Sequence, residues 1–520
     1  IMKNIILFNN KFFIFITLFL FSFLVNQYYG NIGVFPVDSF SHFDTGYRIL
    51  LNEHPFKDYW IISGPLVDYF QALFFYLFGV NWQIYILHAS IINAILTIIT
   101  YIVLINFNLN PIYSFIYSLF FSILAYPSSG TPFVDHHSAF FSLIGIYFLI
   151  LAIKNNAIYY WILLPIAFIF AFLSKQVPAT YIIISAIIIL IYYSISLKKF
   201  KWIFYSFLSF IFTILFVIIF GKFQGISLSS FLEQYILYPQ TIGNKRFSNL
   251  GLDFSNLITH FKFIYISLLP LAYINLKNLF SEKKYFKSKD FFYFLILILL
   301  TFSLIFHQLL TRNQTFIFFL IPILIAFSHI SINSNKLIIS VILILFCLGI
   351  TTKYHLRFNE NRKFHELIYS DFNLAVNADK IDKKFSGLKW ISPEYSKNPD
   401  EEINLINEMK NYFKNDNRNK MIMTNYSFFS AILENKTFST TRWHIFDGTD
   451  YPQVNSKYFI SYKKLIINSL RNNNIKVVYI VHPVQSSNLY NYVDDECFKK
   501  NKINKILTSY EIKNCKEIDG

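Results

Sequence analysis

Charged residues are scarce in this chain of 520 residues. Asp, Glu, Lys and Arg make up 15% of the sequence, whereas soluble domains carry about 25%. Hydrophobic residues reach 54%, above the roughly 45–50% of apolar residues in soluble domains. This composition excludes a water-soluble enzyme.

Three other patterns are missing from the sequence. There is no basic stripe interleaved with stacking aromatics, so the formal net charge of +16 does not indicate a nucleic-acid-binding protein. No glycine-rich phosphate loop follows the strand-like runs of the C-terminal third, which argues against a nucleotide site there. No internal repeat is visible. Disorder is also excluded, because 62 Phe and 36 Tyr supply too much apolar surface for an unfolded chain.

Long apolar runs occupy the first two thirds of the chain. A helix needs roughly 20 residues to cross a hydrocarbon core of about 30 Å, and fewer where the bilayer thins. Such runs lie near residues 12–27, 83–105, 112–126, 138–153, 157–173, 177–196, 203–220, 262–277, 291–309, 315–330 and 337–352. Residues 1–352 hold 20 Lys and Arg and 10 Asp and Glu, whereas residues 353–520 hold 26 and 20. We therefore expect an α-helical polytopic membrane domain over 1–352, with about 11 transmembrane helices, and a small α/β domain over 353–520.

The lysines between these runs indicate an orientation, because cytoplasmic loops hold the excess of Lys and Arg. With the N-terminus inside, the cytoplasmic side receives Lys3, Lys11, Lys154, Lys198, Lys199, Lys201, Lys277, Lys283, Lys284, Lys287, Lys289 and Lys336. An odd number of spans then puts residues 353–520 in the periplasm of a multi-pass protein of the cytoplasmic (inner) membrane. No small-residue cleavage site follows the first run, so we expect a retained anchor and not a signal peptide.

The C-terminal third alternates strand-like and helix-like segments. Residues 401–413 form a polar amphipathic stretch, 427–433 and 463–470 are helix-like, and 420–424 and 475–481 are strand-like. This alternation favours a partly parallel sheet. Cys497 and Cys515 are either bridged by a disulfide, as in an oxidising compartment, or two separate thiols.

Acidic residues of the membrane part gather on one expected face. Six of its ten acids fall in the first two outer loops or the segment leading out of the first, namely Asp38, Asp44, Glu53, Asp58, Asp68 and Asp135. A carboxylate near apolar walls loses solvation, so its pKa rises and it becomes usable as a base near neutral pH. The alternative for each acid is a solvated loop residue.

Short sequence motifs in these loops resemble those of a known family. The first loop reads DSFSHFDTGYRIL at 38–50, HPFKDY at 54–59 and GPL at 64–66, the second reads TPFVDHH at 131–137, and SKQVP follows at 174–178. In this order they resemble the outer loops of GT-C superfamily glycosyltransferases, which include protein O-mannosyltransferases, aminoarabinose transferases of lipid A and bacterial Rgt-type enzymes. The resemblance covers roughly the first 330 residues.

The resemblance implies transfer of a sugar from a polyprenyl-phosphate donor to a cell-envelope acceptor, whether lipid, glycan or protein. Asp38 matches the catalytic acid of the family, and Asp135 matches the acid of the second outer loop. The matching phrases also suggest substrate-binding roles for His42, Asp44, Asp58, His136, His137, Lys175 and Gln176.

Two cations are candidates to stabilise the departing lipid phosphate, Lys175 and Arg312, because negative charge on that phosphate grows in the transition state. The alternative for both is a side chain that reaches ordinary lipid headgroups. In the C-terminal third, Arg442, Trp443 and His444 could bind sugar or could close a turn-rich loop.

A divalent metal site is a weaker interpretation of Asp135, His136 and His137. His136 and His137 are adjacent and so point in different directions, and a two-carboxylate site would need Asp38 near Asp135. Ser39 also stands where the family often has Glu. We therefore expect no cofactor. Two other functions stay open: a lipid or polysaccharide transporter, and an O-antigen ligase or polymerase.

Overall fold

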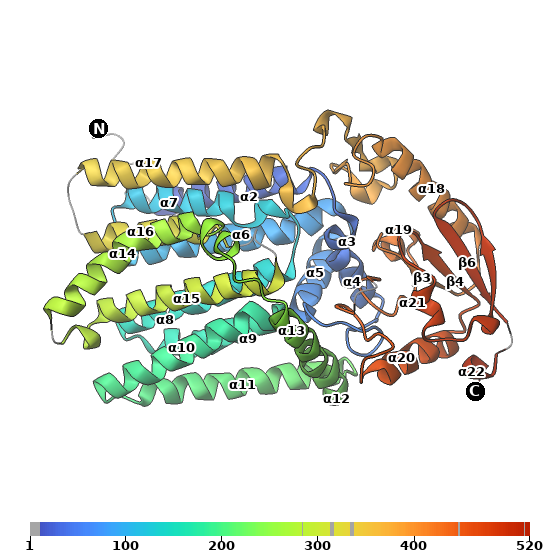
Figure 1. The fold of residues 1–520 in the computed structure, drawn as a ribbon, viewed down its shortest axis with the longest axis horizontal. Coiled ribbons are helices and arrows are strands. Elements are labelled where there is room, and N and C mark those ends of the chain that lie inside the picture. Colours follow the sequence, from blue (N-terminus) through green and yellow to red (C-terminus); the bar gives the residue numbers. More distant parts are fainter. Residues whose placement is uncertain are drawn as a thin grey trace. The chain divides into compact units, whose positions relative to one another are not determined.

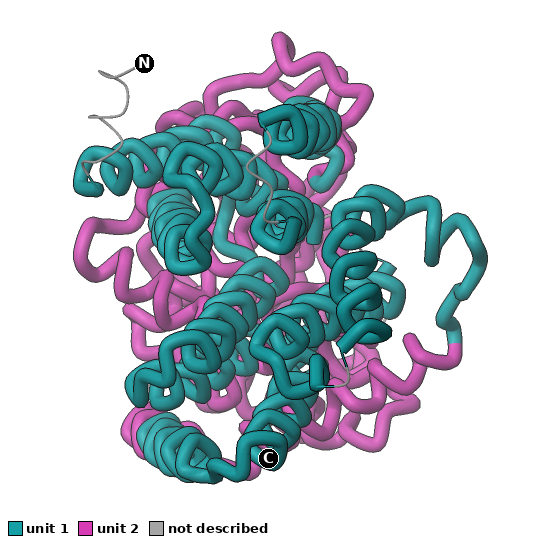
Figure 2. The backbone as a smooth tube through the Cα atoms, turned by 90° about the vertical axis from the view of Figure 1, so that its left-hand side faces the viewer, with its two compact units in different colours: residues 1–31, 86–217, 249–364 teal, residues 32–85, 218–248, 365–520 magenta. Residues whose placement is uncertain are grey.

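The computed structural model describes residues 11–282, 284–312, 317–332, 337–445, 448–513 and 515–519. Lys3, Lys283 and Lys336, which contribute to the expected orientation, lie outside these ranges. The chain divides into two compact units, coloured in Figure 2. Unit 1 comprises residues 1–31, 86–217 and 249–364, and unit 2 comprises residues 32–85, 218–248 and 365–520. Unit 2 thus contains both the first expected outer loop and the C-terminal third. The division at residue 352 expected from the sequence assigns these two parts to different domains.

Unit 1 is built from helices that run roughly parallel to one another (Figure 1). They are α2 (Lys11–Gly30), α6 (Trp82–Asn106), α7 (Pro111–Leu124), α8 (Val134–Asn155), α9 (Ile158–Ser174), α10 (Gln176–Leu197), α11 (Lys201–Phe223), α14 (Lys262–Ser281), α15 (Lys289–Thr311), α16 (Leu320–Ile332) and α17 (Leu337–Tyr354). The ends of α6 and α11 extend into unit 2. Each apolar run expected from the sequence overlaps one of these helices.

Eight helices among the described residues are long and apolar enough to cross a membrane, which is consistent with a membrane protein. They are α2, α6, α8, α10, α11, α14, α15 and the segment Leu337–His365, which contains α17. The other three expected runs fall on the shorter helices α7, α9 and α16, of 14, 17 and 13 residues.

The helices of unit 1 differ in how much of their surface is buried. The apolar window of α8 is 83% buried, whereas that of α11 is 11% buried and carries exposed rings such as Phe212 and Phe216. An apolar face of this kind needs an apolar surrounding such as lipid. Helix α8 packs closely on α9: a Cβ atom on Gly145 would lie 2.5 Å from Cε1 of Phe168. The residues from Val134 to Phe140, at the N-terminal end of α8, are all buried.

Unit 2 combines short helices of the first loop and of residues 218–248 with the C-terminal third. The first group is α3 (Pro36–Ser39), α4 (Ser41–Leu50), α5 (Pro65–Phe78), α12 (Leu228–Phe231) and α13 (Tyr238–Ser248). The C-terminal group is β1 (Val376–Asn377), β2 (Lys389–Trp390), α18 (Pro399–Asn415), β3 (Lys420–Met423), α19 (Phe429–Leu433), α20 (Phe459–Asn472), β4 (Val477–Val481), α21 (Ser487–Tyr490), β5 (Phe498–Lys502), β6 (Leu507–Ile512) and α22 (Lys516–Asp519).

A four-stranded sheet in the order β3-β4-β6-β5 forms the centre of the C-terminal group. Strands β3 and β4 are parallel, with Ile422 opposite Tyr479, and the other two pairings are antiparallel. The expected partly parallel sheet is confirmed. Strands β5 and β6 were not expected. Strand β5 lacks an apolar pattern, because the four residues after Phe498 are polar and exposed. Cys497 and Cys515 form a disulfide, with their Cα atoms 5.2 Å apart.

The first loop is part of the same core as the C-terminal third. The amide of Gly33 donates to the carbonyl of Lys389 at 3.0 Å, and Trp60 N donates to Thr440 O at 2.8 Å. The ring of Phe40 is fully buried, with its centroid 4.8 Å from that of Phe428. Unit 2 is therefore one folded body in which residues more than 300 positions apart in the sequence are in direct contact.

Candidate functional site

Asp135 and Lys175 form an ion pair in unit 1. Asp135 lies in the first turn of α8, where the helix dipole favours a negative charge. Lys175 is the extended residue between α9 and α10, and its Nζ atom lies 2.8 Å from Oδ1 and 2.7 Å from Oδ2 of Asp135. One turn further along α8, the hydroxyl of Ser138 donates to the carbonyl of Lys175 at 3.0 Å. Side chains of α8 therefore hold both the backbone carbonyl and the ammonium group of Lys175.

His307 completes the cluster from α15. Its Nε2 atom lies 2.9 Å from Asp135 Oδ1, so the carboxylate accepts from both an ammonium and an imidazole. The side chain of Asp135 is 7% exposed and that of Lys175 is 19% exposed. Part of the Lys175 ammonium surface thus stays exposed, while the buried Asp135 carboxylate holds it in place.

The two histidines after Asp135 have separate partners. His136 Nε2 lies 3.1 Å from the hydroxyl of Ser128, while His137 Nε2 lies 2.9 Å from His88 Nε2. His137 also contacts the hydroxyl of Tyr126. Both histidines are fully buried, and they diverge as expected for neighbours on a helix. In the ranges that the structure describes, no three His, Cys, Asp or Glu side chains are placed to hold one metal ion.

Asp38 lies in unit 2, on the short helix α3 that Pro36 opens. It is half-buried, and its backbone carbonyl accepts from the hydroxyl of Ser41 at 3.2 Å. The preceding carbonyl, that of Val37, accepts from Nε1 of Trp443 at 2.7 Å. A residue of the C-terminal third therefore holds the backbone next to the predicted catalytic acid.

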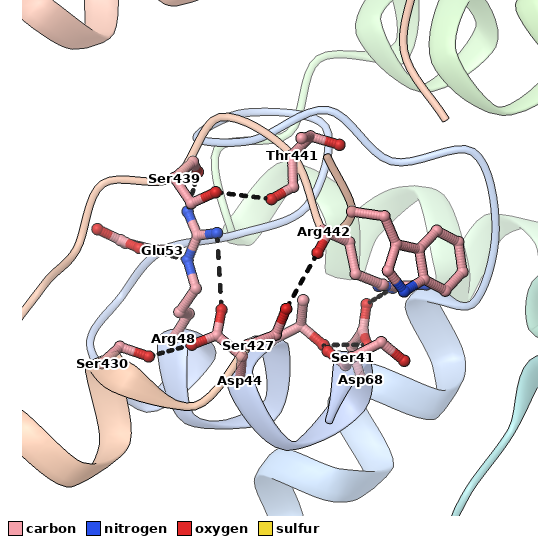
Figure 3. A network of polar contacts seen from close by, with 12 residues as sticks. Ser41, Asp44, Arg48, Glu53, Asp68, Ser427, Ser430, Ser439, Thr441 and Arg442 are labelled. Atoms are coloured by element: carbon pink, nitrogen blue, oxygen red, sulfur yellow. Dashed lines mark hydrogen bonds and ion pairs between the residues drawn. The ribbon is translucent and has the colours of Figure 1, made fainter. Parts of the chain in front are cut away.

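A buried network surrounds Asp44 (Figure 3). Asp44 accepts from the hydroxyl of Ser430, while Arg48 donates from Nε to Glu53 at 2.7 Å and from Nη2 to the carbonyl of Ser439 at 2.7 Å. Burial raises the pKa of the Asp44 carboxyl, and the nearby Arg48 charge opposes that rise. The contacts tie α4 to the C-terminal third, and this structural role explains the placement of Asp44.

A second buried network has Asp68 at its centre. Its Oδ1 accepts from Nδ1 of His42 at 2.7 Å and from the hydroxyl of Thr45, and its Oδ2 accepts from Arg442. Arg442 also donates to the carbonyl of Ser63 at 2.9 Å. Burial, together with the Arg442 charge, lowers the pKa of His42, and the hydrogen-bonded Asp68 carboxylate opposes that shift. These contacts favour the interpretation in which Arg442 closes a turn-rich loop over the interpretation in which it binds sugar.

The remaining predicted residues lie apart from these networks. Asp58 Oδ2 accepts from the backbone amide of His54 at 2.7 Å and stabilises a turn. Gln176 opens α10, where its carbonyl accepts from Thr180 at 2.7 Å. Arg312 ends α15 in an exposed left-handed conformation, with Nη2 3.4 Å from the carbonyl of Asn249.

Sequence reasoning missed His307, because it lies inside an apolar run without a motif. An ionisable residue in the last turns of a spanning helix is itself a signal for a functional site. It also missed Arg442 as the partner of Asp68, because 374 residues separate them.

Comparison of the sequence with models of known protein families gives no match, and no curated protein matches it significantly. Two groups offer side chains that could take part in catalysis: Asp38 in unit 2, and the Asp135–Lys175–His307 cluster in unit 1.

Proposed function

We propose that this protein is an inverting glycosyltransferase of the GT-C type, acting at the outer face of the cytoplasmic membrane. It moves a sugar from a polyprenyl-phosphate donor to a hydroxyl of a cell-envelope acceptor. The observation that carries the proposal is the partly exposed ammonium of Lys175, held by Asp135 at the end of the membrane-length helix α8.

Lys175 has the chemistry that such a transfer needs at its leaving group. When the bond between the anomeric carbon and the phosphate oxygen breaks, negative charge grows on the lipid phosphate. A fixed cation in a poorly solvated site lowers the energy of this state more than that of the bound donor. An ammonium has three N–H donors, and Asp135 engages two of them, so one direction stays available for a phosphate oxygen.

Asp38 is the proposed base. Its carboxylate takes the proton of the acceptor hydroxyl while the hydroxyl oxygen forms the new bond to the anomeric carbon, opposite the breaking bond. The products are the glycosylated acceptor with inverted configuration and free polyprenyl phosphate. Trp443, by donating to the carbonyl of Val37, gives the C-terminal third a role in holding this acid.

The disulfide supports the proposed orientation. Disulfides persist in oxidising compartments, and the bond between Cys497 and Cys515 lies in the segment that positive-inside reasoning exports. An exported C-terminal third would meet the acceptor on the outer side, where lipid-linked sugars are used.

The test is transfer by the purified full-length protein in lipid nanodiscs. Polyprenyl-phosphate sugars are supplied with an envelope extract, and acceptor-dependent release of polyprenyl phosphate is measured. Asp38→Asn should reduce release by about 10²–10⁴-fold, the usual contribution of a general base. Asp379→Asn, a change of an exposed acid in the same unit, serves as the matched control.

Three outcomes would contradict the proposal. Full activity of Asp38→Asn would remove the base. Movement of the donor lipid between leaflets without release would indicate a transporter. Use of an oligosaccharide donor in place of a monosaccharide donor would indicate a ligase or polymerase. Mass spectrometry of envelope glycolipids with and without the gene would then identify sugar and acceptor together.

A further inference from the structure

A polar pocket of about 300 Å³ lies in unit 1 where α14 begins and α17 ends. Three cations line it: Lys262, Lys353 and Arg357. The remaining lining residues are Ser255, Asn256, Thr259, His260, Phe263 and Tyr354. Lys175, Asp135 and His307 are not among them, so this pocket is separate from the cluster described above.

The three cations of this pocket lack a carboxylate partner among the residues that the structure describes. In the ranges that the structure describes, none of the three forms an ion pair with a carboxylate. No acid lines the pocket, and the neighbouring Asp253 is engaged with the backbone and side chain of Asn256. Three like charges around one cavity raise its electrostatic free energy, and a bound anion would lower it.

The ring of Phe263 organises two of the cations. The Nζ atoms of Lys262 and Lys353 lie 5.4 Å and 4.6 Å from its centroid, at distances typical of cation–π contacts. Arg357 is half-buried in the helical turn that follows α17. The pocket therefore offers two point charges and one planar guanidinium, the combination that binds phosphate oxygens in proteins.

The position and volume limit the ligand. Both α14 and α17 belong to segments long enough to cross a membrane, so a pocket at their ends would meet lipid headgroups in a bilayer. A volume of about 300 Å³ suits a headgroup and not a whole lipid. The hydroxyls of Ser255 and Thr259 line the same space and can donate to phosphate oxygens.

We propose that the pocket formed by Lys262, Lys353 and Arg357 binds a phosphate monoester, carried either by a membrane lipid or by a soluble compound. The proposal is independent of the glycosyltransferase assignment, because binding is measured without any transfer reaction.

The test is native mass spectrometry of the full chain in detergent, titrated with phosphatidic acid, inorganic phosphate or phosphatidylcholine. We expect phosphatidic acid to bind with at least tenfold higher affinity than phosphatidylcholine. The triple variant Lys262→Gln, Lys353→Gln, Arg357→Gln should lose that preference, and Lys353→Gln alone, a change of an exposed residue, should weaken it. The control removes three positive charges near the other end of α14, with Lys277→Gln, Lys284→Gln and Lys287→Gln, and should keep the preference.

The two sources of phosphate are separated by competition. Displacement of phosphatidic acid by inorganic phosphate at comparable concentration assigns the site to a soluble phosphate compound, and resistance to displacement assigns it to a lipid. The proposal is overturned if phosphatidic acid and inorganic phosphate both fail to bind above the phosphatidylcholine level. Equal loss of binding in the pocket variant and the control variant would also overturn it, because that result indicates diffuse surface charge.

Discussion

The indole Nε1 of Trp443 donates a hydrogen bond of 2.7 Å to the backbone carbonyl of Val37, next to Asp38. These residues are separated by 406 positions in the sequence and belong to the same compact unit. The C-terminal third therefore supports the loop that carries the proposed base, and this support can be tested separately from stability.

Trp443→Phe keeps an aromatic ring and removes this hydrogen bond. We expect a loss of about 1 kcal/mol in the free energy of unfolding, the usual net contribution of one hydrogen bond. We expect the rate of transfer to fall by more than this loss of stability alone explains, because the backbone beside Asp38 loses its support. Tyr479→Phe removes one hydrogen bond to Asp416 elsewhere in the unit and should leave transfer unchanged. Equal transfer in the two variants would mean that Trp443 has only a structural role.

Asp135→Asn should destabilise the protein by about 3 kcal/mol, because the Lys175 ammonium, 19% exposed, would keep its charge without a carboxylate partner. The measurement is denaturant unfolding of the full chain in detergent. The double variant Asp135→Asn, Lys175→Met should be more stable than the sum of the single effects indicates, since the unpaired charge is gone. Strict additivity would show that the two side chains are not coupled.

Arg442→Met should cost about 3–5 kcal/mol in the free energy of unfolding, because it leaves the fully buried Asp68 carboxylate without its guanidinium. Arg418→Met is the matched control: Arg418 pairs with Asp416 and Glu511, but it is 41% exposed, so we expect at most about 1 kcal/mol. A similar small loss in both variants would show that the Asp68 network does not hold the unit together.

His444 makes the stability of unit 2 depend on pH. Burial, with the charge of Arg48, lowers the pKa of this histidine to about 3 in the folded state. The unfolded state therefore takes up a proton that the folded state does not between about pH 6.5 and pH 3. Stability should fall by about 1.4 kcal/mol per pH unit as the pH decreases through this window.

His444→Gln should remove this contribution, and His482→Gln, a change of an exposed histidine, should not. Pulse proteolysis of the full chain at a series of pH values measures the difference. Asp44 acts in the opposite sense, because its pKa is raised on folding, but it is present in both variants and cancels in the comparison. Parallel pH curves for the wild type and His444→Gln would contradict the assignment.

The disulfide between Cys497 and Cys515 should block both thiols until a reductant is added. Alkylation after reduction should then add two labels in the C-terminal third, detected as a mass shift. Reduction should also destabilise this part by about 3 kcal/mol, because a loop of 18 residues is released in the unfolded state. Labelling without reductant in intact membranes would contradict a position outside the cytosol.

The apolar runs, the strand patterns of β3 and β4 and the amphipathic residues 401–413 determined helices and strands by themselves, because period and composition are local properties of the chain. Strand β5 was missed because its polar residues carry no such period, and only pairing with β6 makes it a strand. The tertiary structure alone decided that Lys175 and His307, 40 and 172 positions from Asp135, share one carboxylate, and that Arg442 closes on Asp68. Contacts of this range depend on how whole helices pack, and packing is set by the shapes and volumes of many side chains together, which no local pattern records.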